Sequence, residues 1–275
     1  MVLRGIDVSH HQGGVDWRAV RRAGVVFAYC KTSEGLDYRD PRWIANRTAA
    51  RAAGLHVGGY HYARPGAHPY SPAAEARHFA VQLGEQAPGD LPPALDLEEH
   101  GGLPAAQLVE WAVEFLTELD EHSVRPPVLY TGPAFYAEHL DNTRALDRWP
   151  LWIAHYTPAP RPRAPRSWTF WQHTSKGRVP GVDGLVDLDR FYGDESALAA
   201  LLGMDWEEWL VRKLPTLRRG DEGEDVGTVQ ALANARGAQL AEDNVFGPKT
   251  EAEVRRLTGR GVVDHTTWAK LLRVS

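Results

Sequence analysis

The sequence predicts an α/β protein: an irregular (β/α) barrel of about eight mostly parallel strands, followed by a small all-α domain. Three observations lead to this prediction. Short apolar segments recur with little polar alternation, which is typical of strands covered on both faces. Amphipathic helical segments separate the early strands, as in a parallel sheet. After Gly203 the pattern changes to short helices joined by glycine-rich turns.

Eight strands are expected in the first part of the chain. They are Leu3–Val8, Val25–Lys31, Val57–Tyr62, Ala94–Glu98, Val128–Thr131, Leu151–Tyr156, Trp168–Gln172 and Val186–Phe191. The first and last strands of a closed barrel must be neighbours. Later strands are joined by segments such as Pro158–Pro165, which is too short and proline-rich for a full helix, so the barrel is expected to be irregular.

Helices between the early strands have recognisable ends. Asp40-Pro41 is expected to open a helix that Gly54 closes, and Ser71-Pro72 a helix that Gly84 closes. Each start combines a capping side chain with a proline in the first turn. A third, amphipathic helix is predicted by apolar residues at helical spacing: Leu108, Trp111, Ala112, Phe115, Leu116 and Leu119.

A separate small domain is expected at the C-terminal end. The predicted boundaries are a barrel over residues 1–203, a linker helix within 204–214 and a helical domain over 215–275. Thr250 and Glu253 are expected to form a capping box for a helix that runs through Leu257.

Composition argues against several classes of protein. The net charge of -5 and the pI of about 6.2 give no electrostatic reason to expect binding to nucleic acid. Cys30 is the single cysteine and lies in an apolar segment, which predicts a buried packing residue and no disulfide or thiolate metal cluster. No segment approaches the roughly 20 apolar residues of a spanning helix, so no membrane insertion is expected. A monomer is expected.

Four acids occupy predicted strand ends. Asp96 and Glu98 end the segment Pro93–Glu98, and side chains two apart on a strand face the same side at a Cα spacing of about 6.6 Å. Two carboxyls that close cannot ionise independently, which suits acid/base chemistry. Asp7 and Asp187 lie on the first and last strands. Because the C-terminal ends of parallel barrel strands meet at one mouth, the four acids are expected to form one site.

Aromatic residues share these strand ends: Tyr60, Tyr62, Tyr130, Trp152, Tyr156, Trp168 and Trp171. A single aromatic at strand spacing is more often a core residue, but acids surrounded by aromatics favour a carbohydrate cleft. No metal or cofactor is expected, since His10, His11 and His61 lack the spacing of zinc motifs. Ser9 and Ser33 lack the glycine pattern of a nucleophile elbow, which disfavours a serine hydrolase.

Several motifs taken together point to a known family. They are Gly5–Gln12 (GIDVSHHQ), Lys31–Gly35 (KTSEG), Gly59–Tyr62 (GYHY), Ala94–Glu98 (ALDLE), Leu129–Gly132 (LYTG), Leu151–Ala154 (LWIA), Trp171-Gln172 and Val186–Phe191 (VDLDRF). In this order they resemble the glycoside hydrolase family 25 lysozymes. The resemblance implies an N-acetylmuramidase that hydrolyses the β-1,4 bond between N-acetylmuramic acid and N-acetylglucosamine in bacterial peptidoglycan.

The resemblance also implies roles for the acids. Glu98 is the expected proton donor, with a pKa raised by Asp96 and by aromatic shielding. Asp96 is expected to stay ionised and to support the 2-acetamido group of the substrate, which itself attacks the anomeric carbon. Asp7 and Asp187 complete the acidic ring; Asp189 faces the same side as Asp187 and can share its role. The alternative is an inverting mechanism in which Asp7 or Asp187 activates water.

Further substrate contacts are expected from residues within or next to these motifs. They are Lys31, Tyr62, Tyr130, Trp152, Tyr156, Gln172 and Asp189.

The C-terminal part resembles the small helical peptidoglycan-binding domain of cell-wall hydrolases. The matching segments are Leu217–Gly223, Val226–Gln230, Val245–Thr250 and Thr267-Trp268. The chain departs from that pattern at Asn244, where the family usually has glycine, and at Leu257-Thr258, where it has Phe-Gln. Wall binding and a purely stabilising role both remain open.

Two other functions are compatible with parts of the sequence. A family 18 chitinase-like barrel also uses an acid pair on the fourth strand, but Pro92 and Ala94 stand where its earlier aspartates would be. A non-catalytic wall-binding protein would not need all four acids. The segment Met1–Asp7 lacks the apolar region of a secretory signal. Action on the cell wall is therefore expected after release by lysis or non-classical export, by a phage endolysin or a bacterial autolysin.

Overall fold

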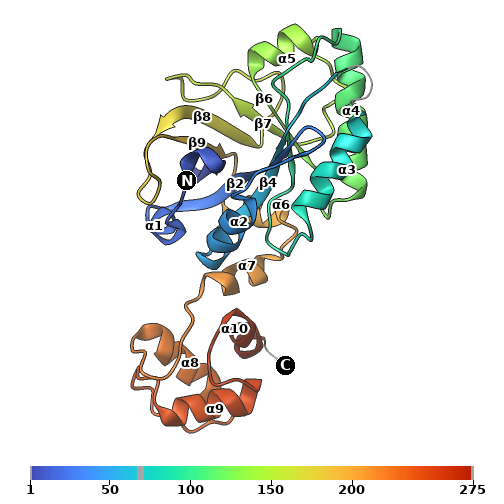
Figure 1. Ribbon diagram of the computed structural model, residues 1–275. Coiled ribbons are helices and arrows are strands. Elements are labelled where there is room, and N and C mark those ends of the chain that lie inside the picture. Colours follow the sequence, from blue (N-terminus) through green and yellow to red (C-terminus); the bar gives the residue numbers. More distant parts are fainter. Residues whose placement is uncertain (1, 67–70, 274–275) are drawn as a thin grey trace. The chain divides into compact units, whose positions relative to one another are not determined.

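The computed structural model describes residues 2–66 and 71–273 (Figure 1). The chain divides into two compact units, Met1–Gly203 and Met204–Ser275. Among the described residues, none of the helices combines the length and the apolar character that crossing a bilayer requires.

Eight strands of the first unit close into a barrel, as predicted. They are β1 (Leu3–Val8), β2 (Val25–Glu34), β4 (His56–Tyr62), β5 (Ala94–Asp96), β6 (Val128–Thr131), β7 (Leu151–Ala154), β8 (Phe170–Gly177) and β9 (Val186–Phe191). The sheet closes because β1 pairs with both β2 and β9. A two-residue strand, β3 (Tyr38–Arg39), pairs with the end of β2.

The last strand runs against the others. Neighbouring strands from β1 to β8 of the barrel are parallel, whereas β9 is antiparallel to both β8 and β1. The mouth formed by the C-terminal ends of the parallel strands therefore receives the N-terminal end of β9. Asp187, the second residue of β9, pairs with Asp7 near the end of β1. Asp187 therefore lies at the mouth, as expected, but its strand runs in the opposite direction to the parallel strands.

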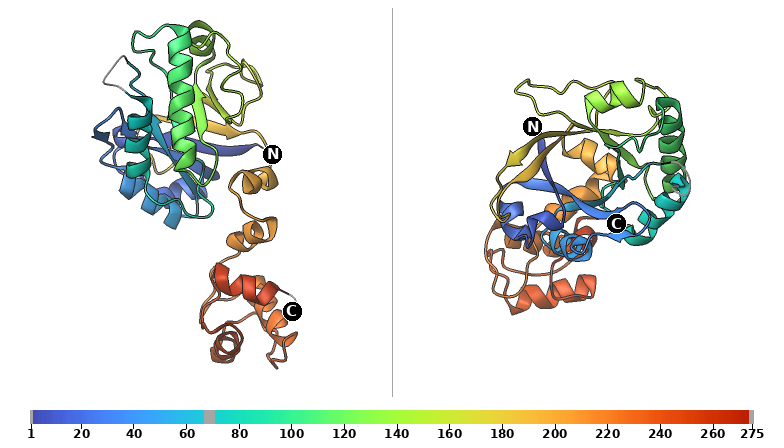
Figure 2. Two further views of the ribbon diagram at one scale, coloured as in Figure 1. Left: turned by 90° about the vertical axis from the view of Figure 1, so that its right-hand side faces the viewer. Right: turned by 45° about the horizontal axis from the view of Figure 1, so that its top comes forward.

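Helices lie around the strands (Figure 2). They are the 3-10 turn η1 (His10–Gln12), α1 (Trp17–Arg22), α2 (Trp43–Ala52), α3 (Pro72–Leu83), α4 (Ala105–Glu121), α5 (Pro133–His139) and α6 (Glu195–Leu201). Residues 155–169 and 178–185, which join β7 to β8 and β8 to β9, form no helix. The barrel is therefore irregular, as the proline-rich late connections predict.

The predicted helix ends are largely confirmed. The Ser71 side chain accepts a hydrogen bond from Ala74 N at 3.3 Å and caps α3, and Gly84 follows its last residue. The helix expected to open at Asp40-Pro41 is α2, which starts later, at Trp43, with Arg42 as its N-cap and no capping side chain. Asp40 Oδ1 instead accepts a hydrogen bond from Arg42 N at 2.8 Å before the helix begins. All six apolar residues that predicted α4 are buried.

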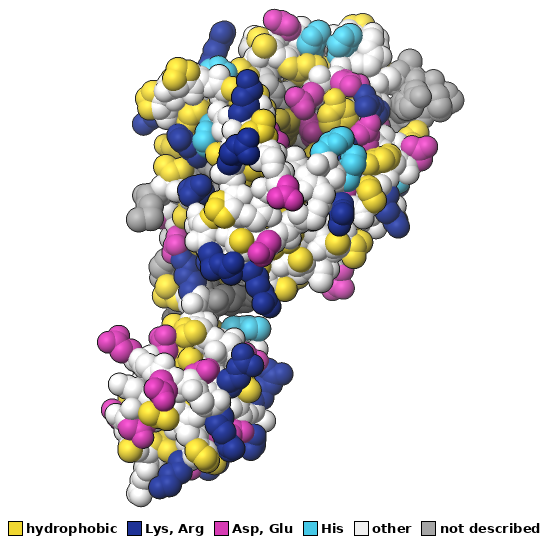
Figure 3. All heavy atoms as spheres, turned by 60° about the vertical axis from the view of Figure 1, so that its left-hand side comes forward, with side chains coloured by type: hydrophobic (Ala, Val, Ile, Leu, Met, Phe, Trp, Pro, Cys, Tyr) yellow, Lys and Arg dark blue, Asp and Glu magenta, His cyan; other side chains and the backbone are white. Residues whose placement is uncertain are grey.

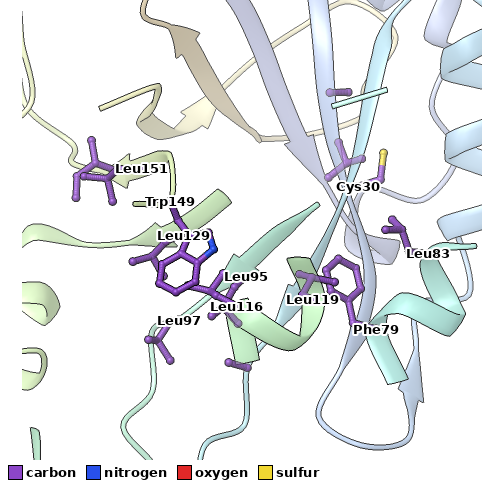
Figure 4. Close-up of a cluster of buried hydrophobic side chains, with 14 of the residues drawn as sticks. Cys30, Phe79, Leu83, Leu95, Leu97, Leu116, Leu119, Leu129, Trp149 and Leu151 are labelled. Carbon is purple, nitrogen blue, oxygen red and sulfur yellow. The ribbon is translucent and has the colours of Figure 1, made fainter. Parts of the chain in front are cut away.

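The core of the first unit lies between the helices and the outer face of the strands (Figure 4). Leu95, Leu129 and Leu151 of the strands belong to one buried cluster with Phe79 of α3 and Leu116 of α4. Cys30 is buried in the same cluster, as predicted, and burial raises the pKa of its thiol.

Aromatic rings fill the barrel beneath its mouth. The Tyr29 ring stacks on Trp152 with centroids 4.5 Å apart, and Phe170 contacts both Phe27 (5.3 Å) and Phe191 (5.4 Å). Because strand side chains alternate, Tyr29 faces inward while its neighbour Cys30 packs under the helices. These rings leave a shallow mouth rather than a pore.

Six strand ends differ from the prediction: β2 continues to Glu34, β4 begins at His56 and β8 continues to Gly177, whereas β5, β7 and β8 each lack predicted residues at one end. Strand β5 ends at Asp96, although Leu97 N still donates to Tyr130 O at 2.9 Å, so Glu98 lies beyond the paired ladder. Strand β7 ends at Ala154, which leaves Tyr156 in the following loop. Strand β8 begins at Phe170, so Trp168 lies before it. A backbone hydrogen bond from His155 N to Gln172 O joins the chain just after β7 to β8.

The second unit is helical, with α7 (Trp206–Lys213), α8 (Glu224–Asn234), α9 (Pro248–Thr258) and α10 (His265–Leu272). Its core surrounds Trp268, which is fully buried and whose Nε1 donates to Pro215 O at 2.8 Å. Val211 of α7 belongs to this core, so the predicted linker helix packs as part of the second unit.

The prediction of a capping box at Thr250 and Glu253 is wrong. Helix α9 starts two residues earlier, at Pro248, because Gly247 provides the N-cap position and a proline suits the first turn. The Thr250 hydroxyl instead accepts a hydrogen bond from Gln230 Nε2 at 3.2 Å, which links α9 to α8.

Candidate active site

A cleft of about 290 Å³ opens at the mouth of the barrel. Its lining residues are Asp7, Ser9, His11, Lys31, Tyr60, Tyr62, Asp96, Glu98, Tyr130, Trp152, Tyr156, Gln172 and Asp187. Figure 3 shows a hollow on the first unit in which acidic side chains gather. The four predicted catalytic acids all belong to this lining, as do the predicted substrate contacts other than Asp189.

Asp96 and Glu98 form the closest pair of acids in the cleft. Asp96 is the last residue of β5 and is 6% exposed, whereas Glu98 is exposed to solvent two residues later. A hydrogen bond joins the two carboxyls, so they do face the same side, as predicted.

Loss of hydration raises the pKa of both carboxyls. For Asp96, burial is the largest cause, and the charge and hydrogen bond of Glu98 raise the pKa further, against the opposing charge of Lys31. For Glu98, partial desolvation by the cleft walls raises the pKa, and so do the charges of Asp187 and Glu99, while the hydrogen bond with Asp96 lowers it.

The free site therefore differs from the expected charge distribution. The sequence predicts an ionised Asp96 that keeps Glu98 protonated. Asp96 is the more deeply buried carboxyl, and the hydrogen bond between the two raises the pKa of Asp96 while it lowers that of Glu98, so burial and pairing both favour the neutral form of Asp96.

Gln172 joins Asp7 to two tyrosines across the cleft. Its side chain is almost fully buried, and its Nε2 donates to Asp7 Oδ2 at 2.7 Å. Its Oε1 accepts hydrogen bonds from Tyr130 Oη at 2.9 Å and Tyr156 Oη at 2.7 Å. One amide thus fixes three residues of the cleft wall.

Asp7 and Asp187 face each other across the β1–β9 pair. Burial raises the pKa of Asp7 well above its usual range, the charges of Asp189 and Asp187 raise it further, and the Gln172 hydrogen bond opposes them. Burial also raises the pKa of Asp187. The site therefore concentrates carboxyls that resist ionisation when the cleft holds no cation.

Asp189 lies beneath the cleft rather than in its lining. It is 1% exposed and accepts a hydrogen bond from Trp152 Nε1 at 2.9 Å. Burial raises the pKa of Asp189 to about 8. The expected direct contact with substrate is not supported, because the side chain points into the packed interior, where it holds the Trp152 ring in place.

Five of the expected aromatics line the cleft, and two do not. The lining aromatics are Tyr60, Tyr62, Tyr130, Trp152 and Tyr156. Trp171 is buried in the outer core, where its Nε1 donates to His155 O at 2.8 Å, and Trp168 packs against the same core. Neighbouring side chains of a strand point to opposite faces of the sheet. Because the Gln172 side chain points into the cleft, the Trp171 side chain points away from the barrel interior.

Ser9 and His11 line the cleft; both lie in the motif Gly5–Gln12, but the sequence did not predict them as site residues. They belong to the η1 turn, in which Ser9 Oγ accepts a hydrogen bond from His11 N at 3.2 Å and Ser9 N donates to Gln12 Oε1 at 2.9 Å. His10 Nδ1 lies 2.8 Å from Asp40 Oδ2 and ties this turn to the chain after β2. The Ser-x-x-Gln capping pattern directly after the first strand is the signal that could have predicted the turn.

In the part of the chain that the structure describes, no group of three or more His, Cys, Asp or Glu side chains is arranged to hold a metal ion.

The sequence model of the glycosyl hydrolases of family 25 matches residues 6–182, which include most of the barrel and three of the four acids. The chain belongs to glycosyl hydrolase family 25. It is therefore a glycoside hydrolase, and the chitinase-like alternative no longer applies.

Relatives in this family include both bacterial and fungal enzymes. Lysozyme M1 of Streptomyces globisporus is 38% identical over 210 residues, which cover 72% of this chain and 71% of that protein. The autolytic lysozyme of Clostridium acetobutylicum is 31% identical over 257 residues, covering 92% of this chain and 72% of that protein. Among solved structures, a family 25 lysozyme from Aspergillus fumigatus has a TM-score of 0.67 at 30% identity and covers 74% of this chain and 99% of its own.

Proposed function

We propose that this chain is a lysozyme that hydrolyses the β-1,4 bond between N-acetylmuramic acid and N-acetylglucosamine in peptidoglycan. The observation that carries the proposal is the hydrogen-bonded pair Asp96–Glu98 in a cleft of acids and aromatic rings. Membership of family 25 and relatives that are named lysozymes support it.

Glu98 is the proposed general acid, because it is the exposed member of the pair and can reach a bound glycosidic oxygen. When a 2-acetamido N–H of the substrate donates to Asp96, ionised Asp96 is favoured. The proton of Asp96 then moves along the existing hydrogen bond to Glu98, and Glu98 delivers it to the leaving oxygen. General acid catalysis of this kind typically contributes about 10² to 10⁴-fold.

The acetamido carbonyl oxygen is the proposed nucleophile at the anomeric carbon, with Asp96 stabilising the charge that develops on the acetamido nitrogen. Asp7 and Asp187 act on the cationic sugar. Because burial raises their pKa values, a carboxylate there is poorly hydrated and interacts strongly with a positive charge at the anomeric centre. Their stabilisation is therefore greatest in the transition state.

The stereochemistry of the first product tests this route. Substrate-assisted attack gives two inversions, so NMR of a defined oligosaccharide digest should show the β-anomer first. An α-anomer formed first would reject it and favour a water activated by Asp7 or Asp187.

The products released from cell walls test the bond that is cleaved. Mass spectrometry of digested walls should show reducing-end muramic acid. Products ending in glucosamine would contradict the proposal, because they result from a glucosaminidase. Zymography on peptidoglycan gels separates an enzyme from a pure binder, which leaves no clearing.

We also propose that the second unit binds peptidoglycan and that the protein acts at the bacterial cell wall. The helical segments described above resemble a wall-binding domain, and the match to the autolytic lysozyme covers 92% of the chain, which is more than the barrel alone. Cosedimentation with purified walls tests the domain, using the full chain with Glu98→Gln and the same chain with Trp268→Ala added. Loss of binding on adding Trp268→Ala is expected; equal binding would leave the second unit a stabilising role.

A further inference from the structure

Glu98 lies beyond the paired part of β5, so the strand ladder alone does not fix its position. The loop after β4 runs beside it. Ala63 N donates to Asp96 O at 2.9 Å, and the next residue, Arg64, reaches Glu99, the residue directly after Glu98. Arg64 Nη1 lies 2.5 Å from both carboxylate oxygens of Glu99.

Arg64 bridges Glu99 to a second carboxylate. Its Nε and Nη2 donate to Glu34 Oε1 at 2.8 and 2.6 Å, and Glu34 Oε2 accepts from Lys31 Nζ at 2.5 Å. Burial opposes ionisation of Glu34, but the hydrogen bonds from Lys31 and Arg64 lower its pKa overall. Lys31, Glu34, Arg64 and Glu99 form a chain of alternating charges, which we call the ion-pair chain.

The ion-pair chain runs along one wall of the cleft. Its first member, Lys31, lines the cleft together with Tyr62. The Lys31 ammonium lies 5.0 Å and the Arg64 guanidinium 4.8 Å from the centre of the Tyr62 ring, and Tyr62 Oη donates to Glu99 Oε1 at 3.1 Å. The wall and the loop that carries Glu98 are therefore joined through Arg64.

Other contacts hold the same loop without Arg64. Gly101 has a φ of +56°, and a Cβ there would lie 1.7 Å from Pro65 O, so the two loop backbones touch. The His100 ring stacks on His139 of α5 with centroids 4.6 Å apart. The loop should thus keep its path when Arg64 is removed, while Glu98 loses its lateral support.

We propose that Arg64 is a positioning residue for the proton donor, because it holds Glu99, and with it Glu98, against the cleft wall. This inference rests on the role of Glu98 proposed above. A displacement of about 1 Å in a reacting group can cost about a hundredfold in rate. Contacts to the sugar come from other lining residues, so the loss should fall on kcat rather than on KM.

Kinetics on a soluble peptidoglycan oligosaccharide test the proposal. Arg64→Ala should lower kcat about 10- to 100-fold and change KM by less than about threefold. Arg64→Lys keeps the charge but cannot bridge two carboxylates, so it should recover only part of the loss. Arg77→Ala is the matched control: Arg77 makes a similar two-bond pair with Glu118, at 2.7 and 3.1 Å, between α3 and α4, and its loss should leave kcat unchanged.

The pH profile of kcat distinguishes positioning from a general loss of structure. The titratable groups around Glu98 are Asp7, His11, Lys31, Asp96, Glu99, Asp187 and the cleft tyrosines Tyr60, Tyr62, Tyr130 and Tyr156. In Arg64→Ala the negative charge of Glu99 is no longer compensated, which raises the pKa of Glu98 further. The alkaline limb of the kcat profile should therefore move to higher pH. In Glu99→Gln that charge is gone, so the limb should move to lower pH while kcat again falls.

Opposite shifts of the alkaline limb support the inference. A wild-type kcat for Arg64→Ala, or unchanged limbs in both variants, would overturn it. Should Arg64→Ala fail to fold, Arg64→Gln, which also removes the charge, carries the same comparison with Glu99→Gln. Activity of Glu98→Gln, in contrast, would reject the proposed proton donor itself, whatever the Arg64 variants do.

Discussion

Replacing Glu98 by glutamine removes the proposed proton donor with little change of shape. Glutamine can still accept the hydrogen bond from Asp96, but it has no proton of suitable acidity to give. The loss of general acid catalysis, about 10² to 10⁴-fold, corresponds to about 2.7–5.4 kcal/mol in the activation barrier. Turnover on purified cell walls should therefore fall at least a hundredfold.

The same substitution should not destabilise the fold. Partial desolvation and the charges of Asp187 and Glu99 raise the pKa of Glu98 in the folded protein. A carboxyl whose pKa rises on folding costs stability progressively as the pH increases through its unfolded and then its folded pKa. Glutamine avoids this cost, so the variant should melt at or above the wild-type temperature at pH 7. The difference should vanish below about pH 4.

Release of reducing ends from walls and melting temperatures at pH 4 and pH 7 provide the two readouts. Glu110→Gln, on the exposed side of α4, is a matched control and should keep wild-type turnover. Activity of Glu98→Gln within tenfold of wild type would assign the proton donor elsewhere. A melting temperature lowered by more than about 4 °C at pH 7 would refute the electrostatic reasoning and indicate structural damage.

Three further substitutions test the packing around the site and in the second unit. Asp189→Asn keeps an acceptor for Trp152 but cannot ionise. Since burial raises the Asp189 pKa to about 8, the variant's gain in unfolding free energy, measured in urea, should grow between about pH 4 and pH 8; a constant difference would contradict this. Gly101→Ala should cost clearly more stability than Gly102→Ala and lower turnover, because a Cβ collides with backbone only at Gly101; equal costs would refute it. Trp268→Ala should lower the unfolding free energy of the second unit by about 3–5 kcal/mol. Calorimetry should show a lower melting temperature for the second unit alone; a shift of the barrel transition would contradict this.

Much of the cleft was predictable because its residues follow strands at regular places. Asp7, Asp96 and Tyr130 lie at or near the ends of parallel strands, and any closed barrel brings such ends to one mouth. Ser9 and His11 were missed because the turn that carries them is a local capping structure rather than part of a strand.

The sequence by itself determined the barrel, the helical second unit and the group of acids at the mouth, since strand alternation, helical spacing and capping are local properties of the chain. Only the tertiary structure decided the reversed direction of β9, the burial of Asp189 beneath the cleft and the burial that raises the pKa of Asp96. The burial of each acid and its hydrogen-bond partners depend on residues that are distant along the chain. Gln172 and Asp7 are 165 positions apart, and Arg64 and Glu99 are 35 apart. No local pattern encodes such contacts, and they contribute to pKa shifts such as those of Asp7 and Glu34.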